Sequence, residues 1–246
     1  MKFSIVLATL AAVASAAPSR DVSSSSGHKV QKRAVFTPKT FDELSISGGK
    51  AGTAKEDALA KLSGLPADLS TVDKADLTFL DGVNKIANQA ERGAYNAKIA
   101  ETAPGEDALA LQRAKIQNKV LKLTATVMGL QADQAQGKNV TAKLEEETKK
   151  LNKNIADDVA NAGKPATALQ FNASTDNPTA SEVPKDEALA TKAGDVIDQS
   201  LAAAGGGQGA AGKNKNNGGN GKGKGKGSGA ASKAVEAVQD AVEDEE

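Results

Sequence analysis

The stretch that decides the fold reads IQNKVLKLTATVMGL and occupies residues 116–130. Its large apolar residues recur at steps of 4, 3, 4 and 3, at Ile116, Val120, Leu123, Val127 and Leu130. That spacing is typical of a helix that packs a seam against neighbouring helices, as in a coiled coil. Leu109 falls in the same register, so the pattern predicts a long helix within an all-α protein.

A second helix is predicted upstream of this stretch. Asp73 is a good N-cap residue, and Asp76 follows at the third helical position. An apolar stripe then continues at helical spacing through Phe79, Val83, Ile86, Ala90 and Ala97. Pro104 and Gly105 end the pattern before the long helix begins.

A third helix is predicted downstream, after a turn that Gly137 permits. Its stripe consists of Val140, Leu144, Leu151, Ile155 and Val159. A short helix from Thr53 to Leu62 is a fourth, less regular element. Because the connections are short, we predict a three- to four-helix up-down bundle over residues 34–165.

The C-terminal third has no such pattern, and we divide it by composition. Residues 166–203 are predicted to be a linker. Residues 204–230 are rich in glycine, lysine and asparagine, which predicts a disordered, solvated tail. As an alternative, the lysines of this tail could bind an anionic polymer. Residues 231–246 form a short acidic segment with valines at helical spacing.

The N-terminus has the features of a secretory signal. Lys2 precedes a short apolar run, and small residues at 14–16 predict cleavage after Ala16. Residues 17–33 are polar and serine-rich, which predicts a disordered propeptide. It ends at Lys32-Arg33, a dibasic pair of the kind that processing proteases cut. The apolar run is shorter than the roughly 20 residues that span a bilayer, so we expect a secreted, extracellular protein without a membrane anchor.

Composition argues against several classes of enzyme. The chain has no cysteine, and its one histidine, His28, lies in the predicted propeptide. A serine triad, a cysteine nucleophile and a catalytic zinc site each need one of these residue types. A hydrolase that uses two carboxylates stays possible in principle, but the processed chain offers few aromatic side chains for a sugar cleft. We therefore expect no enzyme activity, no cofactor and no metal site.

Two tripeptides match the N-glycosylation pattern, which has meaning in a secreted chain. They begin at Asn139 and at Asn172, and both fall in predicted turn or linker regions. After removal of residues 1–33 the charged residues number 26 basic and 30 acidic, from 31 of each minus five and one, a net charge of −4. That near balance does not indicate a nucleic-acid partner.

Particular segments resemble a family of fungal small secreted proteins. The resemblance rests on the signal, the propeptide ending at Lys32-Arg33, the segment ISGGKAG at residues 46–52 and the run KVLKLT at residues 119–124. It covers residues 44–163 and implies an uncharacterised, cysteine-free, helical extracellular protein with no catalytic residues to transfer. The Gly/Lys/Asn tail departs from the compact members. By architecture alone, the chain is also similar to cysteine-free helical proteins that bind lipids or hydrophobic surfaces at fungal walls.

These features together predict a secreted, non-enzymatic helical protein that acts in the extracellular space or cell wall. An interface with a host organism is one place where it could act. Its partner is unknown, and a cell-wall polysaccharide and a host protein are the candidates. The alternative is an extracellular carrier of a small apolar ligand, such as a fatty acid or a sterol, held between the helices. A wide apolar cavity would favour the carrier, a cleft with two facing carboxylates would favour the hydrolase, and neither feature would favour the interaction protein.

Overall fold

A computed structural model describes residues 34–205 of the 246-residue chain. The predicted signal and propeptide, with Ala16, Lys32 and Arg33, lie outside the described residues, as do most of the Gly/Lys/Asn tail and the acidic segment. The helices are α1 (Phe41–Leu44), α2 (Ala54–Lys61), α3 (Lys74–Ala90), α4 (Ala97–Glu101), α5 (Glu106–Ala135), α6 (Thr141–Ala160) and α7 (Glu187–Gly205).

Shorter elements connect these helices. Two 3-10 turns, η1 (Leu69–Thr71) and η3 (Pro178–Ser181), accompany a π-helical turn, η2 (Glu91–Asn96), between α3 and α4. The strands β1 (Gly49–Lys50) and β2 (Pro165–Ala166) pair antiparallel. The predicted all-α helical bundle is therefore confirmed.

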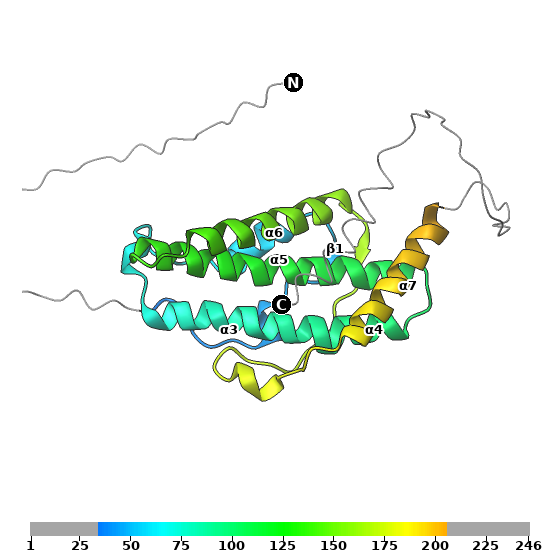
Figure 1. Ribbon diagram of the computed structural model, residues 1–246, viewed down its shortest axis with the longest axis horizontal. Coiled ribbons are helices and arrows are strands. Elements are labelled where there is room, and N and C mark those ends of the chain that lie inside the picture. The colour runs from blue at the N-terminus through cyan, green and yellow to red at the C-terminus, as the bar shows by residue number, and fades with distance from the viewer. Residues whose placement is uncertain (1–33, 206–246) are drawn as a thin grey trace, which may run out of the picture. The chain divides into compact units, whose positions relative to one another are not determined.

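Helix α5 is the central element of the bundle. It packs against α3 on one side and α6 on the other, and it also contacts α2 and α7. Figure 1 shows α5 between α3 and α6. Of the predicted seam, Val120, Leu123 and Val127 are buried. Because neighbours surround α5, most of its polar residues between Arg113 and Thr124 are buried as well.

The start of α3 holds the N-terminal segment of the described chain. Asp73 caps the helix as predicted, since its side chain accepts a hydrogen bond from the backbone N–H of Ala75. The buried carboxylate of Asp76 accepts hydrogen bonds from the backbone N–H groups of Val35 (2.8 Å) and Phe36 (3.0 Å). The Phe36 ring stacks on Phe79, with ring centroids 4.6 Å apart. The segment before α1 is thus attached along α3.

Helix α6 differs from the predicted apolar stripe. Leu151 and Ile155 of that stripe pack against the core. Val159, however, is 56% exposed, and the buried residues are Glu147, Asn154 and Asp158. One carboxylate oxygen of Asp158 accepts hydrogen bonds from the backbone N–H groups of Gly52 and Ala54, each at 2.9 Å, at the start of α2. The buried face of α6 thus mixes apolar and polar residues, because Asp158 is needed as an acceptor for the backbone at the start of α2.

The segment predicted to be a linker contains ordered helix. Within residues 166–203 the structure has η3 and most of α7, whose first turn is capped by Asp186 through the backbone N–H of Leu189 (2.9 Å). Ala193, Val196 and Ile197 of α7 form a second apolar cluster with residues of α4 and α5. The helical part of the described chain therefore continues to Gly205. Its alanine-rich stripe is narrow, which explains why the sequence pattern was weak.

Candidate functional site

The structure places both predicted glycosylation residues on the surface. Asn139 is exposed in the turn between α5 and α6, and Asn172 is exposed between β2 and η3. They lie on separate segments and do not form a joint site. Exposure leaves both positions accessible, and their glycosylation stays a prediction.

A buried group of charges lies between η2 and α5, and we call it the Glu91 cluster. It comprises Glu91, Lys115, Lys119 and Lys122, of which Glu91 is 1% exposed and the lysines are 3–7% exposed. Lys122 Nζ lies 2.9 Å from Oε2 of Glu91. Lys119 Nζ and Lys115 Nζ lie 3.7 and 3.9 Å from the other oxygen, Oε1. Three ammonium groups thus surround one buried carboxylate.

The backbone geometry explains how this cluster forms. Lys115, Lys119 and Lys122 follow at intervals of four and three, so they share one face of α5. On the opposite side, η2 joins α3 to α4 with π-helical hydrogen bonds between residues five apart. In an α-helix, residues five apart point about 140° away from each other. In the π turn, Glu91 and Asn96 instead lie nearly one above the other and both face α5.

The lysines determine the protonation state of Glu91. Burial by itself would raise the pKa of this carboxyl, but the charges of Lys122, Lys119 and Lys115 and the hydrogen bond from Lys122 outweigh it. They lower the pKa from 4.5 to about 2. Glu91 is therefore ionised at any ordinary pH, as a buried carboxylate among cations should be.

Asparagine side chains complete the cluster. Lys115 Nζ donates to Oδ1 of Asn96 at 2.6 Å, and Lys122 Nζ donates to Oδ1 of Asn88 at 3.3 Å. The Oε1 atom of Glu91 is buried and accepts no hydrogen bond from the described residues. Buried polar atoms are nearly always hydrogen-bonded, so this oxygen is unusual.

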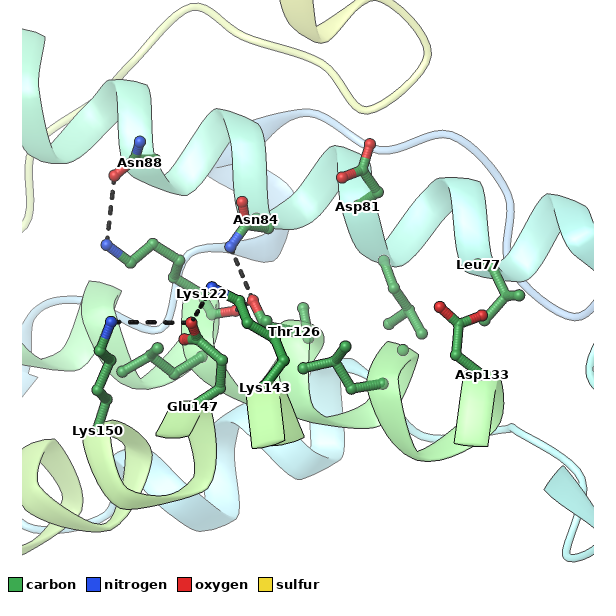
Figure 2. A pocket seen from close by; sticks show the side chains of 15 residues that line it. Leu77, Asp81, Asn84, Asn88, Lys122, Thr126, Asp133, Lys143, Glu147 and Lys150 are labelled. Atoms are coloured by element: carbon green, nitrogen blue, oxygen red, sulfur yellow. Dashed lines mark hydrogen bonds and ion pairs between the residues drawn. The ribbon is translucent and has the colours of Figure 1, made fainter. Parts of the chain in front are cut away.

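A pocket of about 360 Å³ opens beside the cluster, between α3, α5 and α6. Helices α3 and α6 both pack on α5, and the pocket lies in the channel between them, which we call the α3–α6 groove. Leu77 and Leu130 supply partly exposed apolar surface, and Leu80 and Leu123 lie buried at its base. Figure 2 shows the polar side chains around it, with Lys122 reaching from the cluster toward Asn88. Lys122 therefore belongs to both the groove and the cluster.

The polar groups of the groove are mostly paired with each other. Lys143 Nζ lies 3.0 Å from a carboxylate oxygen of Glu147, and Asn84 Nδ2 donates to Oγ1 of Thr126 at 2.7 Å (Figure 2). Among residues 34–205, no group of acidic residues has an arrangement that could hold a metal ion. In the same range, no helix is long and apolar enough to cross a bilayer.

Sequence reasoning did not select the Glu91 cluster or the groove. Glutamate and lysine on helices are usually solvent-exposed, and no motif marks them as buried. The available signal was the spacing of the three lysines on one face of the helix with the clearest apolar seam. A helix packed on several sides has to bury some of its polar face, and these lysines lie on it.

Comparison with known proteins gives one match. Residues 36–170, more than half of the chain, match a family model described as "Domain of unknown function (DUF8454)". No curated protein and no solved structure matches the chain. The matched region contains both the Glu91 cluster and the groove.

Proposed function

Since the chain belongs to the DUF8454 family, whose description assigns no activity, we propose a function from the geometry of its own site. The protein is a secreted, non-enzymatic binding protein, and the α3–α6 groove holds a segment of a partner protein. The observation that carries this proposal is the groove itself, an open channel with leucines along it and charges of both signs at its edges.

The edges of the groove fit a protein partner better than the other candidates. Asp81, Asp133, Lys143 and Glu147 place both acidic and basic groups around the leucines, which suits a helix with an apolar face and charged flanks. The residues that line the pocket include no aromatic side chain on which a sugar ring could stack. A fatty acid or sterol favours an enclosed apolar cavity, whereas this pocket has a polar rim.

The charged side chains of the groove form ion pairs with one another, and this supports the expectation of a non-enzymatic role. Lys150 lies 3.0 Å from Glu146 and 3.8 Å from Glu147, and Lys143 also pairs with Glu147. Side chains held in mutual ion pairs are suited to recognition, because they can exchange partners with a docking segment.

Secretion rests on the signal pattern of residues 1–16 and the dibasic pair at residues 32–33.

Site-directed cross-linking tests the groove, and the absence of native cysteine makes it clean. A photoreactive label is attached to Asp81→Cys at the groove, or to Leu59→Cys on α2, an exposed position that does not line the pocket. The labelled proteins are mixed with secreted and wall proteins of the producing culture, or with host extracellular fluid. We expect a discrete adduct from Asp81→Cys alone.

A second substitution blocks the groove without disturbing the core. A Cβ at Gly129 has room, because it would meet only Leu80 Cβ, at 4.0 Å, and the position lines the pocket into which a longer side chain can extend. Gly129→Leu should abolish the adduct, and Gly129→Ala, the matched control, should retain it. Equal adducts from both labels, or an adduct that Gly129→Leu leaves unchanged, would show that the groove is not the docking site. Retention of the expressed protein inside the cell would contradict secretion.

A further inference from the structure

One hydrogen bond in the Glu91 cluster places a lysine amine beside an asparagine amide. Lys115 Nζ lies 2.6 Å from Oδ1 of Asn96, and both side chains are buried. Because Oδ1 is bonded to Cγ, the same contact brings the amine nitrogen near the carbonyl carbon that it would attack. The carboxylate of Glu91 lies beside the same amine, with Oε1 3.9 Å from Nζ.

We propose that Lys115 and Asn96 form an intramolecular amide bond, with Glu91 as the group that carries the proton. The nitrogen of Lys115 attacks Cγ of Asn96, so that an N–C bond forms and the bond from Cγ to Nδ2 breaks. Glu91 accepts a proton from the attacking nitrogen and delivers it to the leaving nitrogen, which departs as ammonia. In sum, a lysine ammonium and an asparagine amide give a secondary amide and an ammonium ion, and no oxidant or co-reactant is needed.

The position of Glu91 suits the role of proton carrier. Its Oε1 accepts no hydrogen bond from the described residues and faces the reacting amine. The π turn places Glu91 on the same face as Asn96, and Oε1 has to approach Lys115 Nζ from 3.9 Å to hydrogen-bond distance for the proton transfer. The reaction occurs once per molecule, so a small fraction of neutral lysine is sufficient to complete it.

Electrostatics favours the product. Three ammonium groups around one buried carboxylate repel one another. Amide formation makes Lys115 neutral, and the departing ammonium carries its positive charge to solvent. Lys119 and Lys122 then share Glu91 with one fewer competing cation. The reaction therefore relieves a repulsion that the unreacted fold contains.

The bond would close a loop across the bundle. It joins η2 to α5 over a sequence separation of 19 residues, and the loop includes all of α4. A cross-link of this kind restricts the unfolded chain, as a disulfide does. The chain has no cysteine, so an amide is a cross-link open to it.

Mass spectrometry of the full-length protein tests the proposal directly. After denaturation, trypsin cannot cut at an acylated Lys115, so a cross-linked chain yields a branched peptide that joins residues 93–98 to residues 114–119. Its mass is the sum of the two peptides minus one ammonia. The peptide itself is the deciding readout, because Asn217-Gly218 in the tail can also lose ammonia by cyclising. If wild-type protein yields only the separate peptides, the proposal is wrong.

Matched lysine variants identify the nucleophile. Lys115→Arg keeps the positive charge but removes the nucleophilic amine, so the branched peptide should disappear completely. Lys192→Arg on the exposed side of α7, the control, makes the same substitution outside the cluster and the groove, and it should retain the branched peptide. The reverse pattern would overturn the assignment to Lys115 and Asn96. Glu91→Gln should reduce the yield at least tenfold, while an unchanged yield would exclude Glu91 as the proton carrier.

Discussion

The charge of Glu91 should contribute a large part of the stability of the bundle. Glu91→Gln preserves the shape of the side chain and removes the charge. The cluster lowers the pKa of Glu91 from 4.5 to about 2. Since one pKa unit corresponds to about 1.4 kcal/mol, this environment stabilises the folded, ionised form by about 3 kcal/mol at neutral pH. Removal of one partner from a buried ion pair typically costs about 3–5 kcal/mol, which agrees.

We therefore expect Glu91→Gln to lower the free energy of unfolding by about 3 kcal/mol at pH 7 when it is compared in a Lys115→Arg background, which keeps the third positive charge and cannot form the amide. Urea unfolding followed by helical circular dichroism measures this change. Glu145→Gln on the exposed face of α6 is the control, and it should change stability by less than about 0.5 kcal/mol. A loss below about 1 kcal/mol in Glu91→Gln would refute the argument that this carboxylate holds the three lysines.

The pH dependence gives an independent check on the same residue. Because the folded-state pKa of Glu91 is lowered, its stabilising contribution is complete above pH 4.5. It is lost as the pH falls from 4.5 toward 2. In the Lys115→Arg background, the stability difference between the protein that keeps Glu91 and the Glu91→Gln variant should therefore shrink steadily over this range. A difference that is the same at pH 2.5 as at pH 7 would contradict the assignment.

Three further predictions concern other parts of the bundle. Asp158→Ala leaves the backbone N–H groups of Gly52 and Ala54 without their acceptor, and it should cost about 1–3 kcal/mol in urea unfolding. Ile197→Ala opens a cavity between α7 and its neighbours and should lower the free energy of unfolding by about 2–4 kcal/mol. Lys192→Ala, on the exposed side of α7, is the control and should change it little. Equal losses in the two variants would mean that α7 does not pack as described. Gly129→Leu removes a glycine from a helix interior and should leave stability unchanged or raise it by up to about 1 kcal/mol.

The main helices could be predicted from the sequence because their apolar residues are large and regularly spaced. Val120, Leu123 and Val127 are buried as the seam requires, and Asp73 caps α3 as its position indicated. Helix α7 was missed because its buried side consists largely of alanine with Val196 and Ile197, so its contrast with the exposed side is small. Its burial depends on α4, which no local pattern reveals.

The candidate site could not be predicted, for two physical reasons. Lysine and glutamate have the same appearance in a sequence whether they are exposed or buried, and burial of Lys119 follows from the number of helices that surround α5. The π turn that aligns Glu91 with Asn96 also has no reliable sequence signature. Both features arise from tertiary packing and become visible only in the assembled bundle.

The attachment of Val35 and Phe36 to Asp76 has a consequence for maturation. Cleavage after Arg33 would leave Ala34 as the single residue beyond the backbone that Asp76 holds. An aminopeptidase needs several extended residues in its active site, and here it would meet a fixed chain after one. The fold would therefore protect the new end from trimming, so that the mature protein keeps a uniform start instead of a ragged one.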